Sequence, residues 1–585
     1  MAHINLVLKI YNSMMRLRNA LKPLRRFECS ISTQIQPESN LGDNEQSGSK
    51  QPIEGKDTQK IKKPKKSFNS INTLEQLAQP DQLNRPALLN LMESDKPLSY
   101  STFPLNYMNS PLKDIPIPCL CNGLEYVVKT RGLITRDTLG SIVKQDVSDF
   151  YKDLPQPEEI DSEIIGEYKP PSKDELLLSI GKKHKSQYLL ATSTSIPIMS
   201  HIDYFITGFR SPLFNRLSYE YTNEPLRYII SLRKPTTSFA TVVSSEPLMI
   251  AIDSDEGFLE ASNLIFLKMG GYIEHMITQN QQDFNRKFLL KNKPYRLPTD
   301  KARPEYHSFL KAGKMVLRSQ IDAGIMDNKI IKKIEVKTRA ITPQRYDAIN
   351  YDQYFDYKLF KDIGLYESYE REYYDLIRGS FNKYLHQMTI GGMAGVIVAY
   401  HNTKEVFGFE YFDRWHLEKR VYGSQEFAGV CFRAELALMQ EVFDYIFGHE
   451  DLKKVGEVVK IGCFASYFEN CLIIMVERID DVANYKQKLK GSIINPKFND
   501  IMDYYERSKI KPNVSKYTVT VNRKLNGVNM PNNMSIFYEP KDHLEYSYNI
   551  YRKGKVDYKE YMQFLHEAYK GMYKNVENEY SGSWR

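Results

Sequence analysis

The 585-residue sequence has few cysteines and no long apolar run, and each absence excludes a class of protein. Its six cysteines include no Cys-x-x-Cys pair and no cluster with histidine, which argues against a zinc or iron–sulfur site and against a disulfide framework. No apolar run approaches the ~18 residues of a membrane-spanning helix. Any contact with a membrane is therefore expected to be peripheral, with no transmembrane segment.

The sequence also lacks a strong net charge over most of its length. Of the formal +8, residues 1–66 carry +7, which leaves +1 for residues 67–585. A nucleic-acid-binding surface in the body of the chain must therefore come from local clusters of Lys and Arg. A hydrophobic content of 42% and an aromatic content of 12% are sufficient for folded cores.

The N-terminal segment is basic and amphipathic. Residues 1–27 contain six Lys and Arg and no acid, with apolar residues at helical spacing. This composition is typical of a mitochondrial transit peptide, although an ordinary basic helix has the same features. We predict a transit peptide over residues 1–35. Residues 36–80 are rich in Gln, Ser, Asn, Gly, Lys and Pro, and we predict a disordered linker.

The rest of the chain predicts an α/β protein: a mixed sheet with flanking helices. Residues 81–235 are interrupted by prolines and predict an irregular α+β region, whereas residues 236–480 alternate clear strand and helix patterns. Residues 481–585 predict a C-terminal extension. The core pattern predicts strands at 239–245, 248–253, 314–322, 329–339, 393–402, 405–412, 457–466 and 471–479, and helices at 255–279, 355–388 and 426–448.

Three polar residues in the segment 317–340 could meet at one point. Glu335 and Lys337 are two apart on a predicted strand, so their side chains share one face. If the two strands of this segment pair, Asp322 reaches the same place. Two close carboxylates repel unless a cation bridges them, and Mg²⁺ or Mn²⁺ suits such oxygen ligands. Alternatively, Lys337 only pairs with one acid across an exposed sheet.

Basic residues surround this segment and predict contacts with RNA. Residues 284–318 hold ten Lys and Arg against two acids, with aromatic residues such as Phe288 and Tyr295 among them. Cations interleaved with aromatics suit a single-stranded nucleic acid, although a solvated basic loop has the same composition. The predicted RNA-binding residues are Arg286, Lys287, Lys291, Lys293, Arg296, Lys301, Arg303 and Arg318, with Arg339, Gln344 and Arg345 just after the lysine. For those last three, structural pairing is an equal alternative.

The order of the predicted elements resembles the αββαβ core of the PD-(D/E)XK nuclease superfamily. Ile321-Asp322 stands where that motif has Pro-Asp, and Glu335-Val336-Lys337 fills its E-x-K element. The missing proline donates no ligand. The resemblance implies metal-assisted phosphodiester hydrolysis, with Lys337 assisting the attacking water.

Several segments resemble a fungal mitochondrial family that works in RNA 5′-end processing and degradation. They are SHIDYFITGF (200–209), MIAIDSDEG (249–257), LRSQIDA (317–323), EVKTRA (335–340) and GVIVAYHNTKEVFGFEYF (395–412). The match of MGGYIEHMIT (269–278) implies a catalytic and metal-binding role for Glu274 beside Asp322, Glu335 and Lys337. The family commonly has aspartate where this chain has Glu335.

The resemblance implies a function, a location and partners. It implies an Mg²⁺-dependent ribonuclease on the matrix side of mitochondria, peripherally associated with the inner membrane. Mitochondrial RNA is the implied substrate, and the transcription or RNA-decay machinery the implied partner. One alternative is a protein that binds RNA on a nuclease-derived fold without hydrolysing it. A mitochondrial DNA exonuclease is a second alternative, which the missing cysteine cluster disfavours.

Overall fold

The computed structural model of the protein describes residues 95–569, apart from 113–114, 126–127, 129–133, 137–141, 145–146, 162, 165–167, 215–216, 229–233, 256–262, 298–303, 481–510 and 532–533. The predicted transit peptide (1–35) and linker (36–80) lie outside these residues. The described residues belong to one compact unit. None of their helices is both long enough and apolar enough to cross a bilayer.

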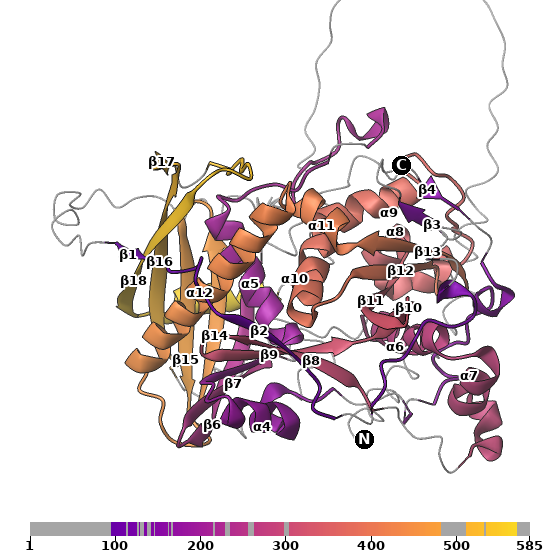
Figure 1. The fold of residues 1–585 in the computed structure, drawn as a ribbon, viewed down its shortest axis with the longest axis horizontal. Coiled ribbons are helices and arrows are strands. Elements are labelled where there is room, and N and C mark those ends of the chain that lie inside the picture. Colours follow the sequence, from indigo (N-terminus) through magenta and orange to yellow (C-terminus); the bar gives the residue numbers. More distant parts are fainter. Residues whose placement is uncertain are drawn as a thin grey trace, which may run out of the picture. The chain divides into compact units, whose positions relative to one another are not determined.

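A large mixed sheet forms one layer of the described part of the chain (Figure 1). Its strands lie in the order β1 (Lys96–Pro97), β18 (Leu544–Lys555), β16 (Asn513–Leu525), β15 (Cys471–Ile479), β14 (Val458–Ser466), β6 (Thr236–Ser245), β7 (Leu248–Ser254), β5 (Tyr188–Ala191), β9 (Met315–Ile321), β8 (Tyr306–Ala312) and β2 (Leu105–Asn109), and β17 (Val528–Met530) pairs with β16. The central β5 runs parallel to both neighbours, and every residue in it is buried. Such continuous burial is typical of a parallel strand covered on both faces.

Helices cover both faces of this sheet. The α-helices among the described residues, not all of which pack on this sheet, are α4 (Glu175–Lys183), α5 (Thr192–Ile206), α6 (Asn263–Thr278), α7 (Gln281–Phe288), α8 (Thr342–Tyr346), α9 (Tyr369–Asp375), α10 (Phe381–Gly391), α11 (Arg414–Val421), α12 (Gln425–His449) and α15 (Tyr558–Tyr569). Residues of α5, α10 and α12 share the largest core with one face of the sheet. On the other face, α4 and α15 pack against separate groups of strand residues. The alternation of side chains along each strand therefore supplies apolar residues to both layers.

A smaller mixed sheet lies beside the large one. Its order is β10 (Ala323–Asp327), β11 (Ile330–Ala340), β12 (Gly395–His401), β13 (Val406–Asp413), β3 (Ile134–Arg136) and β4 (Ile142–Val143). β10 and β11 pair antiparallel, whereas β11 and β12 pair parallel through a crossover that contains α9 and α10. Residues of α6 and α7 share a second core with one face of this sheet.

Helix α10 packs against strands of both sheets (Figure 1). It ends at Gly391 and is followed by Gly392, whose backbone is left-handed with φ +64°. Glycine adopts this conformation without steric strain, which explains a helix end at this position. The remaining short helices are the 3₁₀ segments η1 (Asp149–Tyr151), η2 (Pro171–Lys173), η3 (Tyr219–Tyr221), η6 (Leu290–Tyr295) and η7 (Ala348–Tyr354), and the π-helical segment η8 (Leu376–Ser380).

The structure confirms the predicted α/β class, and each predicted strand of the core is found. Two predictions about local structure are wrong. The strands at 314–322 and 329–339 do not pair with each other, because β10 lies between them and pairs with β11. The single helix expected over 355–388 is broken, since Gly364 and Glu367 have positive φ, and regular helix begins only at α9. The predicted regions 81–235, 236–480 and 481–585 all contribute strands to the large sheet.

Candidate functional site

One face of β11 is charged from Lys333 onward. Ile334 and Val336 point into the core that contains α6, so the alternate residues point to the opposite face. Those alternate residues are Ile331 at the start of the strand, followed by Lys333, Glu335, Lys337 and Arg339. The sequence thus places a lysine, an acid, a lysine and an arginine in line on one strand face, beneath α10.

Asp322 lies where the chain passes from the large sheet to the small one. It is the only residue between β9 and β10, and the pairing of Ala323 with Ile334 places it opposite Glu335. Its Oδ2 accepts a hydrogen bond of 3.0 Å from the Val336 backbone N–H and lies 3.9 Å from Lys337 Nζ. The structure therefore brings together three of the four predicted catalytic residues.

Glu335 is the most deeply buried member of this group. It is fully buried, and its Oε1 contacts Lys337 Nζ. Its Oε2 is buried and finds no hydrogen-bond donor among the described residues. Burial raises the pKa of Glu335 well above its usual value, and the nearby Asp322 raises it further. The single positive charge of Lys337 therefore does not balance the negative charge of both carboxylates when both are ionised.

Lys337 is the accessible member of the group. Its side chain is 27% exposed, and its Nζ lies 6.0 Å from the centre of the Tyr384 ring on α10. Burial alone would lower its pKa, but the charges of Glu335 and Asp322 outweigh burial, and the pKa of Lys337 is raised. It therefore stays an ammonium at neutral pH and can donate hydrogen bonds to an anion above the strand.

Glu274 is not part of this group in the structure. It lies on α6, which packs against the opposite face of β11: a Cβ at Gly270 would lie 3.1 Å from Thr338 Oγ1. No group of three His, Cys, Asp or Glu within the described ranges is placed to hold a metal ion. The predicted three-carboxylate set is therefore not assembled, and a role for Glu274 stays a prediction.

The remaining donors still fit a hard divalent cation in part. Asp322 and Glu335 supply carboxylate oxygens, one of which, Glu335 Oε2, is buried and lacks a donor. Mg²⁺ is usually held by one or two protein carboxylates, with water and substrate oxygens in its other positions. The donor chemistry thus suits Mg²⁺ or Mn²⁺.

The predicted basic segment 284–318 is divided between two places: α7 and η6 lie on the α6 side of the small sheet, whereas residues 306–312 and 315–318 belong to β8 and β9 of the large sheet. Phe284 and Phe288 are buried in the core with α6, so they are not free to stack on bases as predicted. Arg296 pairs with Asp161 at 2.6 Å. Arg286 and Lys287 lie in the last turn of α7, Lys291 and Lys293 are exposed on η6, and Lys301 and Arg303 fall outside the described residues.

The other predicted RNA contacts are engaged within the protein. Arg318 is buried, forms an ion pair with Asp174, and donates to the Lys169 carbonyl at 2.9 Å. Gln344 is fully buried and donates to the carbonyls of Tyr351 and Asn402, at 2.9 and 2.6 Å. These contacts tie loops together and favour structural roles for both residues.

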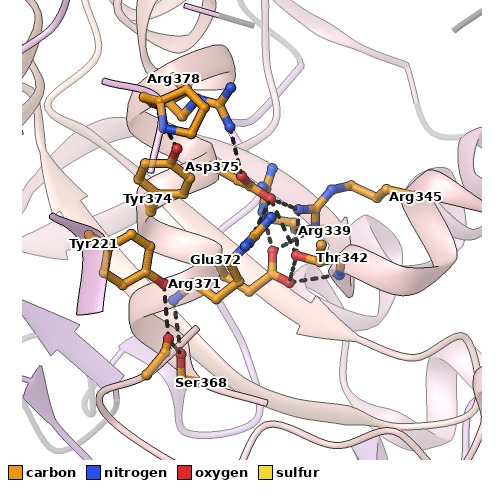
Figure 2. Close-up of polar contacts among 12 residues, drawn as sticks. Tyr221, Arg339, Thr342, Arg345, Ser368, Arg371, Glu372, Tyr374, Asp375 and Arg378 are labelled. Carbon is orange, nitrogen blue, oxygen red and sulfur yellow. Dashed lines mark hydrogen bonds and ion pairs between the residues drawn. The ribbon is translucent and has the colours of Figure 1, made fainter. Parts of the chain in front are cut away.

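Arg339 and Arg345 belong to a buried ion-pair network (Figure 2). Glu372 on α9 accepts from Arg339 at 2.7 Å and from Arg345 at 2.5 Å, and Arg345 also pairs with Asp375 at 2.8 Å. Burial alone would raise the pKa of Glu372, but the two arginines outweigh burial and lower it. The network fixes α8 and α9 to the end of β11, so the structure favours the structural alternative for both arginines.

Sequence reasoning missed one cation on the polar face of β11. Lys333 alternates with Glu335 and Lys337, and this spacing is visible in IIKKIEVK (330–337). Its neighbour Lys332 carries the same charge but belongs to the other face and pairs with Asp327 at 2.6 Å. Because side chains alternate along a strand, the two adjacent lysines point to opposite faces, a difference that counting the charges in the segment does not reveal.

Comparisons with known proteins relate part of this chain to one family. Residues 168–444, just under half of the chain, match the family model described as "Mitochondrial protein Pet127". A Schizosaccharomyces pombe protein named "mRNA degradation protein pet127, mitochondrial" is 29% identical over 286 residues, or 48% of this chain and 53% of that protein. A Saccharomyces cerevisiae protein named "Putative mitochondrial translation system component PET127" is 28% identical over 300 residues, or 50% of this chain and 35% of that protein. The chain thus spans about half or less of these relatives.

Solved structures show only a distant likeness. K. lactis Dxo1, solved in complex with manganese, is 9% identical with a TM-score of 0.33, over 66% of this chain and 93% of that one. Scheffersomyces stipitis Rai1 is 11% identical with a TM-score of 0.28, over 65% of this chain and 97% of that one. Scores of this size do not support an inference about this chain.

Proposed function

We propose that this chain is a mitochondrial RNA 5′-end processing and degradation factor that hydrolyses phosphodiester bonds with a divalent metal, in the manner of PD-(D/E)XK nucleases. The observation that carries the proposal is the meeting of Asp322, Glu335 and Lys337 at the junction of the two sheets. The name of the S. pombe relative, an mRNA degradation protein of mitochondria, supports the substrate class.

The protein residues have separate roles in this proposal. Asp322 and Glu335 would hold Mg²⁺, which supplies a positive charge that activates water and neutralises the reacting phosphate. The Val336 N–H fixes Asp322 before substrate arrives. Lys337 presents its ammonium to the phosphate, where its charge stabilises the transition state. Because Glu335 and Lys337 lie on β11 and Asp322 lies directly between β9 and β10, the two sheets set the geometry of these groups.

Location and partners form part of the same proposal. The matching family model is described as mitochondrial, and both relatives carry that word in their names. We place the protein on the matrix side, peripherally attached to the inner membrane, with the transcription or RNA-decay machinery as its partner. The S. cerevisiae relative is named a putative translation component, which is a different assignment within the mitochondrion.

One observation favours a second candidate, a protein that binds RNA without cleaving it. Lys337 already contacts Glu335 and lies near Asp322, as in a plain buried ion pair. The two acids are not joined by a third acidic, His or Cys ligand among the described residues. In that case the pair would fix the junction of the sheets, and RNA would bind equally well without divalent metal.

Cleavage by matched variants distinguishes the two candidates. The full-length chain is incubated with single-stranded RNA and DNA of one sequence, in Mg²⁺ and in EDTA. We expect Mg²⁺-dependent cleavage of RNA that falls at least about 100-fold in Asp322→Asn and Glu335→Gln, because a lost metal ligand removes several kcal/mol of transition-state stabilisation. Asp327→Asn, an exposed carboxylate on the same hairpin, is the control. Equal rates in all variants would overturn the nuclease proposal.

A further inference from the structure

We propose that Lys333 is a binding residue for an RNA backbone phosphate, next to the phosphate that would react at the metal site of Asp322 and Glu335. This inference rests on the proposed function, because it names a second contact of the same substrate. It is carried by the placement of the Lys333 ammonium, by the kind of partners it has, and by the pair of acids that lies beside it.

The backbone fixes Lys333 on the face that carries the candidate site. Lys333 is two residues before Glu335 on β11, so the two side chains share a face about 6.6 Å apart along the strand. In the sheet, Lys333 is paired with Gly324 of β10, and the Lys333 carbonyl accepts a hydrogen bond of 2.8 Å from the Ala394 N–H. A spacing of this size is comparable with that of neighbouring phosphates in an extended strand of RNA.

Neutral oxygens hold the Lys333 ammonium in place. Its Nζ donates to Asn109 Oδ1 at 2.7 Å and to Ser308 Oγ at 2.8 Å. Asn109 lies on the edge strand β2 and Ser308 on β8, so the large sheet positions a side chain of the small one. An ammonium has three N–H donors, and these two bonds leave one available.

The partners of Lys333 do not cancel its charge. Within the described residues, no carboxylate forms an ion pair with Lys333, although the residue is half-buried and burial lowers its pKa. Lysines that are buried in proteins are usually paired with an acid, and even the exposed Lys332 next in the chain pairs with Asp327. A positive charge held by neutral acceptors is suited to a ligand that brings its own negative charge.

A phosphate is the ligand that this position favours. A substrate strand that approaches Asp322 and Glu335 is repelled by their negative charge. The metal ion and Lys337 would offset this repulsion only for the reacting phosphate. The adjacent phosphate needs a second cation, which Lys333 supplies from the same strand face. Lysine binds phosphate as a point charge, so this contact adds affinity without reading the base sequence.

The test measures RNA binding and its salt dependence without catalysis. A fluorescent single-stranded RNA is titrated with the full-length chain in EDTA, at ~50 and ~200 mM salt, and Kd is obtained from anisotropy. We expect Lys333→Gln to raise Kd roughly tenfold at low salt and to lower the slope of log K against log salt by about 0.7, the value for one phosphate contact in single strands. Lys333→Arg should retain the slope. Lys332→Gln is the matched control and should leave both quantities unchanged.

A second variant tests the charge without touching the lysine. Asn109→Asp gives the ammonium a carboxylate partner on the exposed edge strand, and we expect the same loss of affinity and slope. Asn106→Asp, on the same strand and exposed, controls for the added negative charge. If Asn109→Asp binds like Asn106→Asp, or Lys333→Gln binds like Lys332→Gln, Lys333 is only a structural link between the sheets. If Lys333→Gln lowers the slope of log K against log salt while Asp322→Asn still cleaves RNA as fast as the wild type, the nuclease proposal fails and the proposal for Lys333 stands.

Discussion

Replacing Glu335 by glutamine should make the metal-free protein more stable while it abolishes metal binding. Glu335 is fully buried beside Asp322, and both burial and that charge raise its pKa. At pH 7 the wild-type protein must therefore either ionise a buried carboxyl or take up a proton. Glutamine resembles the protonated form and avoids this penalty.

The size of the effect has an upper limit. The unfolded chain releases the Glu335 proton near pH 4.3, and each pH unit up to pH 7 adds at most roughly 1.4 kcal/mol, so the penalty cannot exceed about 4 kcal/mol. A raised carboxyl pKa stabilises the folded state fully below about pH 4.3, and this contribution is lost as the pH rises through the folded pKa. The advantage of Glu335→Gln should therefore grow from pH 5 to pH 7.

Urea unfolding at pH 5, 6 and 7 in EDTA measures this advantage directly. Asp327→Asn serves as the control, because a carboxylate in a surface ion pair contributes less than about 1 kcal/mol. Added Mg²⁺ should stabilise the wild-type protein and not Glu335→Gln, since ligands stabilise only the state that binds them. A Glu335→Gln variant that is less stable at every pH would show that Lys337 fully balances an ionised Glu335.

Three other variants probe the neighbouring contacts. Lys337→Met leaves two acids without an ammonium, so we expect a loss of about 3–5 kcal/mol at pH 7 that shrinks at pH 5 as Glu335, whose pKa is raised by burial, takes up a proton, measured by urea unfolding; a loss that does not depend on pH would contradict this. Glu372→Gln removes the shared partner of two buried arginines, and we expect a similar loss with an unchanged salt slope for RNA. Because the pKa of Glu372 is lowered by folding, its contribution is present above about pH 4.3 and should disappear as the pH falls. Lys291→Gln should reduce the salt dependence of RNA binding less than Lys333→Gln does, since Lys291 lies on η6 and not on the face of β11 that carries Lys333. An equal reduction would indicate that the segment containing Lys291 also contacts RNA.

The polar strand face could be predicted because it depends only on the period of a strand. Glu335 and Lys337 share a face in any extended segment, and the hydrophobic alternation around Ile334 and Val336 gives the direction of that face. The meeting with Asp322 was predicted for a reason that proved incomplete. The segment is not a simple hairpin, and Asp322 reaches Glu335 because the chain changes sheets there.

The roles of the arginines could not be predicted from local spacing. Arg339 and Arg345 precede their partner Glu372 by 33 and 27 residues, and Arg318 is 144 residues from Asp174. Such pairs depend on how helices pack, which composition does not reveal. The same limit applies to Lys333, whose two acceptors come from strands of the other sheet.

A crystal of the protein soaked in Mn²⁺, with anomalous diffraction recorded, tests the central claim most directly. The account predicts an anomalous peak within about 2.5 Å of oxygens from both Asp322 and Glu335, and loss of this peak in Glu335→Gln. Absence of a peak there, with Lys337 still bound to Glu335, would contradict it.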